Sequence, residues 1–300
     1  MIQVSNVSKS FDQFQVLDDL NLTVKKGSIY GLVGVNGSGK TTIIKHIMGI
    51  LKPDTGAITI GGEPVFDNIP LKRRTGFVPD DLYFFATYSL REMAAFYKRL
   101  YPSWNDERFA AMVSQFGLST KTKLSKFSKG MQKQAAFILT MSEMPDYLVL
   151  DEPIDGLDPL VRKLVWKTIV DDVAEREMSV LVSSHNLREL ESICDAIGIL
   201  SKGAMMIERD LDELKTDIHK VQVAFQPGAR PENPYEGLNI LRTETRGSVD
   251  LLIIRNRKET VDAMLAKSRP AIFDMLPLSL EEIFIYELGG ENDAISSAIF

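Results

Sequence analysis

A glycine-rich segment at residues 34–42 carries the residue types of a phosphate-binding loop, and it matches the pattern G-x-x-x-x-G-K-[ST] without a gap. Glycines allow consecutive backbone N–H groups to converge on phosphate oxygens, and a following helix N-terminus adds partial positive charge. Lys40 is expected to reach the β- and γ-phosphates of a nucleotide, and the Thr41 hydroxyl is expected to ligate Mg²⁺. The residues predicted to bind phosphate are Gly34, Asn36, Gly37, Ser38, Gly39, Lys40, Thr41 and Thr42.

Two carboxylates, Asp151 and Glu152, follow the apolar residues 147–150, which are expected to form a short buried strand. At such a strand end the first carboxylate can hold a metal ion, and the second can orient and deprotonate an attacking water. A solvated acidic loop is the plainer interpretation of the pair. The phosphate loop earlier in the chain favours nucleotide hydrolysis.

Three shorter stretches also carry residue types that could serve a nucleotide site. Residues 127–132 (Phe-Ser-Lys-Gly-Met-Gln) precede a helix expected to begin near Met131, and residues 155–158 read Asp-Gly-Leu-Asp. Residues 183–185 (Ser-Ser-His) place a histidine just past another apolar strand. Each stretch alone is a weak signal, so their order along the chain carries the information.

In this order the stretches resemble the nucleotide-binding domain of ATP-binding cassette (ABC) proteins, and the resemblance covers residues 1–210. It implies Walker A at residues 34–42, Walker B at residues 148–151, the signature at residues 127–132 and the D-loop at residues 155–158. The resemblance also implies the roles of single residues in catalysis and ATP binding: Glu152 as catalytic carboxylate, His185 as switch histidine, Phe11 stacking on adenine, and Ser128, Gly130 and Asp158 as further nucleotide-site residues.

The family mechanism is implied by the same resemblance. Two cassettes pair head to tail, so each ATP lies between Walker A of one subunit and the signature of the other. Ser128 and the Gly130 backbone would contact the γ-phosphate held by the opposite Lys40. Hydrolysis would separate the pair and drive a bound partner.

Two positions depart from the family pattern. The signature reads FSKGM where the family prefers LSGGQ, so Lys129 replaces a glycine and either leans toward phosphate or stays solvated. Asp80 stands where the switch glutamine is expected; a carboxylate can ligate Mg²⁺ but cannot donate a hydrogen bond. We hypothesise that Asp80 keeps the metal-sensing role. The predicted metal ligands are Thr41, Asp80 and Asp151.

Composition limits the classes of partner. The 300 residues suffice for one large and one small domain, and the formal net charge of −6 argues weakly against nucleic acid. Cys194 is the single cysteine, which excludes an intrachain disulfide and fits a reducing compartment. The five lysines between residues 121 and 133 are interpreted as a solvated face.

No apolar run approaches the ~20 residues that span a bilayer, and the N-terminus lacks a signal-peptide core. The protein is therefore expected to be cytoplasmic, and peripheral at the inner face of the cell membrane through a permease.

Hydrophobic patterning predicts alternating strands and helices, which indicates an α/β fold with a parallel sheet. Strands are expected at residues 2–7, 16–24, 29–33, 57–60, 147–150, 179–183 and 196–201. Helices are expected at residues 40–51, after the capping-box sequence that begins at Ser89, and at residues 105–116, 159–176 and 186–194.

After a helix expected at residues 210–215, the composition changes to a loop-rich α+β pattern. Strands are expected at residues 219–225, 239–243 and 249–255, and helices at residues 258–267 and 280–288. We therefore expect a P-loop NTPase of the ABC ATPase type with an N-terminal antiparallel β subdomain, a helical subdomain and a small C-terminal α+β domain. The domain ranges are 1–215 for the ABC ATPase domain (helical subdomain about 81–140), 216–290 for the accessory domain and 291–300 for a tail.

The expected function is ATP hydrolysis, with ATP and Mg²⁺, as the ATPase subunit of an ABC transporter. The subgroup resemblance, carried by residues 80–83, 96–101 and 278–284, is to bacterial drug- and antibiotic-efflux exporters. Expected partners are a separate transmembrane permease and a second ABC ATPase subunit, identical or different, with no nucleic acid. The alternative is a soluble non-transport ABC ATPase in cofactor assembly or regulation. The transported substrate and the role of the C-terminal domain stay open.

Overall fold

The computed structural model describes residues 1–211, 213 and 218–287. The chain forms two compact units. The first comprises Met1–Asn186 and Ile193–Glu208, and the second comprises Leu187–Ser192 and the described residues from Arg209 onward. Each unit has its own hydrophobic core. Within the described residues, none of the helices combines the length and the apolar character needed to cross a membrane.

An antiparallel sheet in the first unit contains β1 (Ile2–Phe11), β2 (Phe14–Val24), β4 (Thr55–Ile60) and β5 (Glu63–Pro64), in the order β2-β1-β4-β5. β1 pairs antiparallel with both β2 and β4. The predicted N-terminal antiparallel subdomain is therefore confirmed. The polar segment between the two expected strands is itself strand, because a two-residue turn joins β1 to β2 and exposed positions in a hairpin accept polar side chains.

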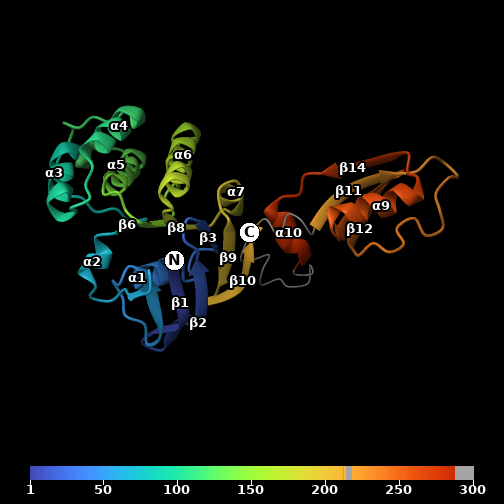
Figure 1. Cartoon of the computed structure of the whole chain (residues 1–300), viewed down its shortest axis with the longest axis horizontal. Coiled ribbons are helices and arrows are strands. Elements are labelled where there is room, and N and C mark those ends of the chain that lie inside the picture. The colour runs from blue at the N-terminus through green and yellow to red at the C-terminus, as the bar shows by residue number, and fades with distance from the viewer. Residues whose placement is uncertain (212, 214–217, 288–300) are drawn as a thin grey trace. The chain divides into compact units, whose positions relative to one another are not determined.

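A six-stranded sheet forms the centre of the first unit (Figure 1). Its order is β10 (Ala204–Asp210), β9 (Ala196–Ser201), β3 (Ile29–Val33), β8 (Ser179–Ser184), β7 (Tyr147–Asp151) and β6 (Thr75–Val78). β3 pairs parallel with β8 and β9, and β7 pairs parallel with β6 and β8, so the predicted parallel sheet is confirmed. β3, β7 and β8 are buried along their whole length, as strands covered on both faces are.

Three helices connect to strands of this sheet: α1 (Lys40–Ile47) follows β3, α2 (Ile69–Lys72) precedes β6, and α6 (Pro159–Arg176) lies between β7 and β8 in the chain. α6 begins where the sequence predicts, because the Asp158 carboxylate accepts from the backbone N–H of Leu160 and Val161, both at 3.1 Å. α1 is shorter than the predicted 40–51. Gly49 has φ +60°, and this left-handed residue ends the helical path.

The helical subdomain contains α3 (Leu90–Leu100), α4 (Asp106–Phe116), the 3₁₀ turn η1 (Leu124–Lys126) and α5 (Lys129–Ser142). The predicted capping box is present: Ser89 N donates to Glu92 Oε2 at 2.7 Å, and Ser89 Oγ accepts from Glu92 N at 3.3 Å. Gly117, at φ +68°, ends α4 as expected. Local caps therefore fix the ends of these helices.

The second unit is an antiparallel sheet with helices. Its strands are β11 (Ile218–Ala224), β12 (Ile240–Arg246), β13 (Val249–Arg255) and β14 (Ile272–Leu276), in the order β12-β13-β11-β14. Its helices include α9 (Lys258–Ser268) and α10 (Leu280–Glu287). Val261 and Leu265 of α9 pack with Val221 and Leu252 of the sheet in one core. The predicted small C-terminal α+β region is thus present.

The short helix α7 (Leu187–Leu190) belongs to the second unit, although it directly follows first-unit residues. The Arg188 guanidinium donates to Glu281 of α10 at 2.8 and 3.0 Å, and Leu280 N donates to Glu191 at 3.3 Å. The predicted helix 186–194 is shorter in the structure, where only Leu187–Leu190 are helical. The predicted helix 210–215 lies partly, and the tail 291–300 wholly, outside the described residues.

Candidate functional site

The phosphate loop joins the end of β3 to the start of α1. Gly37 and Gly39 have φ of +81° and +110°, a backbone region that glycine enters without steric cost. A Cβ atom at Gly34 would lie 2.4 Å from Leu200 O and 2.5 Å from Ser38 Oγ, so no larger residue fits there. The glycines at these three positions therefore follow from the shape of the loop.

Lys40 turns back into the loop. Its side chain is 6% exposed, and its Nζ donates to Gly34 O at 2.5 Å and to Val35 O at 3.3 Å. The same Nζ lies 3.4 Å from Glu152 Oε1. Lys40 and Glu152 are far apart in the sequence, and the fold brings them into contact.

The two carboxylates leave β7 in different environments. Asp151 is 1% exposed, and its Oδ1 accepts from Ser183 Oγ at 2.6 Å. Ser183 Oγ also accepts from Glu152 N at 3.1 Å, so one serine of β8 holds both residues. Sequence reasoning gave Ser183 no role. The signal for it is the parallel register, which pairs Asp151 with Ser183.

The Glu152 carboxylate also contacts His185. Glu152 Oε2 accepts from His185 N at 3.3 Å and lies 2.9 Å from the His185 ring atom Nδ1. The other carboxylate oxygen, Oε1, is buried and has no hydrogen-bond donor. Buried polar atoms are normally hydrogen-bonded, so an unsatisfied oxygen facing Lys40 marks the place for a polar reactant.

These residues fit a nucleotide phosphate and a hard cation. Ser38 Oγ in the loop is, like Glu152 Oε1, buried without a hydrogen-bond partner. Thr41, exposed on the first turn of α1, and Asp151 supply oxygen ligands, the type that Mg²⁺ prefers. In the described part of the chain no three His, Cys, Asp or Glu side chains group as a metal site. Mg²⁺ in phosphoryl-transfer enzymes usually takes one or two carboxylates plus substrate phosphates, so this donor set is compatible.

Asp80 and Lys133 meet beside Glu152. Lys133 Nζ donates to Asp80 Oδ1 at 3.0 Å and to Glu152 O at 2.8 Å, and its side chain is 11% exposed. The prediction that Lys133 belongs to a solvated lysine face was therefore wrong, whereas Lys121, Lys123, Lys126 and Lys129 are exposed. The signal available in the sequence is weak: Lys133 directly precedes residues 134–142, which are all buried.

The signature residues begin α5. Ser128 is the N-cap and accepts from Met131 N at 3.2 Å. A Cβ atom at Gly130 would lie 3.4 Å from Gly156 O, so the start of α5 is close to the 155–158 stretch. Within one chain, Ser128 and Asp158 thus cap helices, and their contacts with a nucleotide stay predictions.

Phe11 lies at the end of the β1–β2 hairpin, paired with Phe14. Both rings are exposed, and Lys9 Nζ lies 5.4 Å from the Phe11 ring centroid. An exposed ring beside a cation suits a stacked planar ligand. Adenine stacking on Phe11 stays a prediction.

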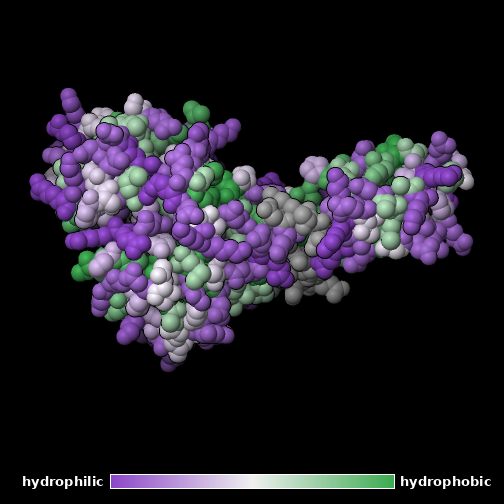
Figure 2. Space-filling view, viewed as in Figure 1, coloured by the Kyte–Doolittle hydropathy of each residue, from purple (hydrophilic) through white to green (hydrophobic). Residues whose placement is uncertain are grey.

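A cavity of about 410 Å³ lies in the first unit. Its lining comes mainly from β6 and the segment after it, from α3 and α5, and from residues just past the ends of α1, α3 and α5. Among the lining residues are Ile50, Phe77, Tyr83, Tyr97, Tyr101, Thr140 and Glu143. Tyr83 is 87% exposed and Ile50 is exposed as well. Figure 2 shows a mostly hydrophilic face with small hydrophobic patches, one of them over α2. We call the cavity and its lining residues the aromatic groove.

Glu143, in the lining of the aromatic groove, is 3% exposed, and burial raises its pKa to about 9. Replacing Glu143 with Gln is expected to raise the melting temperature by an amount that grows with pH. Between pH 4.5 and about 9 the folded state keeps a proton that the unfolded state releases, so wild-type stability falls as pH rises. The amide does not ionise, and its advantage should grow by roughly 2–5 °C per pH unit.

Thermal melts between pH 6 and pH 8 measure this effect. Glu107→Gln is the matched control, because Glu107 is exposed on α4. A constant difference between Glu143→Gln and wild type across this range would contradict a protonated Glu143.

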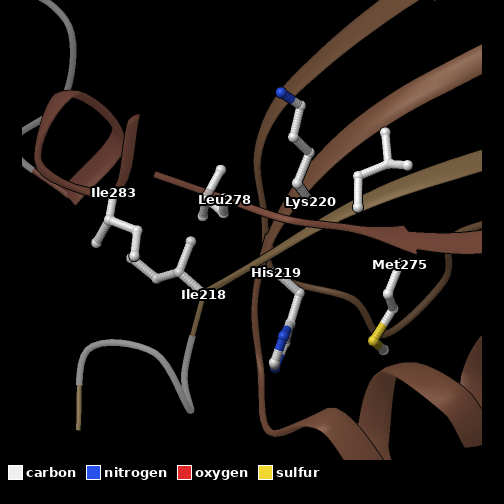
Figure 3. A pocket seen from close by; sticks show the side chains of 7 residues that line it. Ile218, His219, Lys220, Met275, Leu278 and Ile283 are labelled. Atoms are coloured by element: carbon white, nitrogen blue, oxygen red, sulfur yellow. The ribbon is translucent and has the colours of Figure 1, made fainter. Parts of the chain in front are cut away.

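A second hollow, of about 210 Å³, lies in the second unit (Figure 3). Ile218, Leu278 and Ile283 line it, and the neighbouring residues His219 and Lys220 point to opposite sides of β11. Lys220 pairs with Glu282 at 2.6 Å. None of the predicted site residues lines this hollow.

Comparisons with known proteins agree with the geometry. The family described as "ABC transporter" matches residues 17–155. The ABC transporter ATP-binding protein YtrB of Bacillus subtilis (strain 168) is 32% identical over 97% of this chain and 99% of its own length. The bacitracin transport ATP-binding protein BcrA of Bacillus licheniformis is 34% identical over 72% of this chain and 71% of its own length. A solved ATP-binding subunit of an ABC transporter superposes with TM-score 0.68 at 28% identity, over 72% of this chain and 92% of its own.

Proposed function

The chain belongs to the ABC transporter family of ATP-binding proteins, and from that premise we propose that it hydrolyses ATP to drive a separate membrane-spanning permease. The observation that carries the hydrolytic part is the position of Glu152. One carboxylate oxygen contacts His185 and the other faces Lys40 of the phosphate loop at 3.4 Å. A base so placed is beside the phosphate that it must help to cleave.

Each residue then has a defined task in hydrolysis. Lys40 and the loop N–H groups hold the β- and γ-phosphates, and Glu152 takes the proton of the attacking water. His185 fixes the direction of the Glu152 carboxylate through the 2.9 Å contact. Thr41 and Asp151 would hold Mg²⁺, which neutralises charge on the phosphates when bound.

The active form is proposed to be a pair of cassettes. Ser128 caps the start of α5 and Asp158 caps the start of α6, both at exposed positions, and Gly130 lies in the first turn of α5. A second subunit, identical or different, would bring its phosphate loop to this surface. Phe11 would stack on adenine, and Lys129 would lie near the γ-phosphate of the partner's ATP.

The aromatic groove is the proposed docking surface of the permease. It combines exposed apolar side chains with an opening large enough for side chains of a partner. The relative named for bacitracin transport supports an antibiotic or another small molecule as the transported substrate, and export is the direction that we propose. Docking would place the protein at the inner face of the cell membrane, as a peripheral subunit.

The proposed domain arrangement follows the sequence boundaries. Residues 1–215 would carry out hydrolysis, and residues 216–290 would act as a regulatory or dimer-stabilising accessory domain. The alternative function is a non-transport ABC ATPase in cofactor assembly or regulation.

Co-expression with the membrane protein of the adjoining gene tests the proposal. The two chains are expected to co-purify, and vesicles containing both should transport substrate only with ATP. Tyr83→Asp should lower transport about ten-fold, since it places a charge in the aromatic groove. Val170→Asp, a charge on the exposed face of α6, is the control. Robust ATP hydrolysis with neither co-purification nor an effect of Tyr83→Asp would favour the non-transport alternative.

A further inference from the structure

Lys133 is a partly buried lysine, 11% exposed in its side chain, whose ammonium group joins the segments that follow two strand ends. Its Nζ donates to the Asp80 carboxylate at 3.0 Å and to the Glu152 carbonyl at 2.8 Å. Burying a charge is costly unless it is paired and hydrogen-bonded, so these two contacts hold the side chain in one place. The position of Nζ is therefore specified from two sides.

The two strand ends lie at the same level of the sheet. β6 and β7 run parallel, and Val78 of β6 is paired with Leu150 of β7. Asp80 and Glu152 each follow two residues after this pair. Lys133, on α5, reaches across both, so the helix that begins with the signature is connected to the segment after β6 and to the residue after Walker B.

The Glu152 backbone needs such support. Glu152 has φ +47°, a left-handed conformation that costs a non-glycine residue about 1–2 kcal/mol. Its N–H donates to Ser183 Oγ at 3.1 Å, and its carbonyl accepts from Lys133 Nζ at 2.8 Å and, at the longer distance of 3.4 Å, from Asp155 N. The bonds from Ser183 and Lys133 are the shorter ones on either side of Cα, and they fix the direction in which the carboxylate leaves the main chain.

We propose that Lys133 is a positioning residue for ATP hydrolysis, which sets the geometry of Glu152 through its carbonyl; the inference rests on the proposed hydrolytic role of Glu152. The contact with Asp80 is the weaker of the two, because the Asp80 side chain is 51% exposed and exposed ion pairs contribute little. Asp80 then acts through Lys133, by holding the ammonium over the carbonyl.

The variant Lys133→Met keeps the length of the apolar stem and removes the ammonium. Its kcat is expected to fall about 10- to 100-fold, because a catalytic group displaced by ~1 Å can lose about 10²-fold in rate. The Kd for ATP in the absence of Mg²⁺ should change by less than two-fold, since Lys133 makes no bond to the phosphate loop. Lys133→Arg keeps charge and donors and should recover part of kcat.

Two further variants complete the design. Asp80→Asn should lower kcat less than Lys133→Met does, and the double variant should equal Lys133→Met. Lys98→Met is the matched control, because it breaks the exposed Lys98–Asp106 ion pair of the same subdomain away from Glu152. Phosphate release gives kcat, calorimetric titration gives Kd, and a thermal melt checks that each variant folds.

Three outcomes would overturn the inference. They are unchanged kcat in Lys133→Met, a rise in Kd that matches the loss of kcat, or a fall in melting temperature for Lys133→Met and Lys133→Arg that accounts for the lost activity. A changed Mg²⁺ requirement in Asp80→Asn alone would assign Asp80 to the metal instead of Lys133. Absence of ATP hydrolysis in the wild-type chain would defeat the proposed function itself, which is a different result.

Discussion

Replacing Glu152 with Gln is expected to lower the kcat of ATP hydrolysis by about 10²–10⁴-fold while ATP still binds, because a general base contributes that much to rate. Glutamine keeps the size of the side chain but cannot take the proton of the attacking water. It also removes a negative charge 3.4 Å from Lys40, so ATP should bind as tightly as before or more tightly. The variant should therefore stop after binding and accumulate an ATP-bound dimer.

Phosphate release measures the loss of turnover, and light scattering after gel filtration with and without ATP measures the dimer. Glu175→Gln, an exposed glutamate on α6, is the matched control and should behave as wild type. Wild-type turnover in Glu152→Gln would remove Glu152 from the base role. A dead enzyme that also fails to bind ATP would show that the substitution damaged the loop instead.

Replacing Lys40 with Ala is expected to weaken ATP binding about 10²-fold. A hydrogen bond to a charged group contributes about 1.5–3 kcal/mol, and Lys40 supplies the only ammonium that the loop residues 34–42 contain. Removing it also leaves the buried Glu152 Oε1 without its nearby positive charge. Turnover should fall as well, because the same ammonium stabilises charge on the phosphates during cleavage.

Calorimetric titration with ATP measures the affinity. Lys45→Ala is the control: Lys45 is exposed on the same helix, five positions further along the chain. Equal affinity of Lys40→Ala and Lys45→Ala would refute the assignment of residues 34–42 to phosphate binding. Together with Glu152→Gln, this variant separates a defect in binding from a defect in chemistry.

The sequence predicts those parts of the molecule that local signals specify. Asp158 with Pro159 starts α6, Ser89 with Glu92 starts α3 and Gly117 ends α4, each as expected. These signals act within a few residues, so they need no knowledge of the rest of the fold. The apolar runs that became β3, β7 and β8 are equally visible, because a strand covered on both faces has no polar positions.

Other elements depend on their neighbours. The sequence did not predict β6 and β14. β6 is four residues long and contains Gly76, and β14 (Ile-Phe-Asp-Met-Leu) is five residues long without a strict alternation of apolar and polar residues. The site shows the same limit. Lys133 and Ser183 acquire their contacts with Glu152 only when parallel register sets β6, β7 and β8 side by side. Motif spacing along one chain carries no record of that register.

The path of the chain through α7 limits how recombination between genes can exchange the second unit. The chain leaves the first unit after Asn186, the residue that follows His185, contributes residues 187–192 to the second unit, and returns to the first unit at Ile193. A gene cut after Glu208 would keep residues 187–192 but discard Leu280 and Glu281 of α10, which are hydrogen-bonded to Glu191 and Arg188. The C-terminal unit is thus not a simple appended cassette that recombination can add or delete at one junction. Any exchange of this unit between genes must also rewrite the six residues that follow so closely on the histidine next to Glu152.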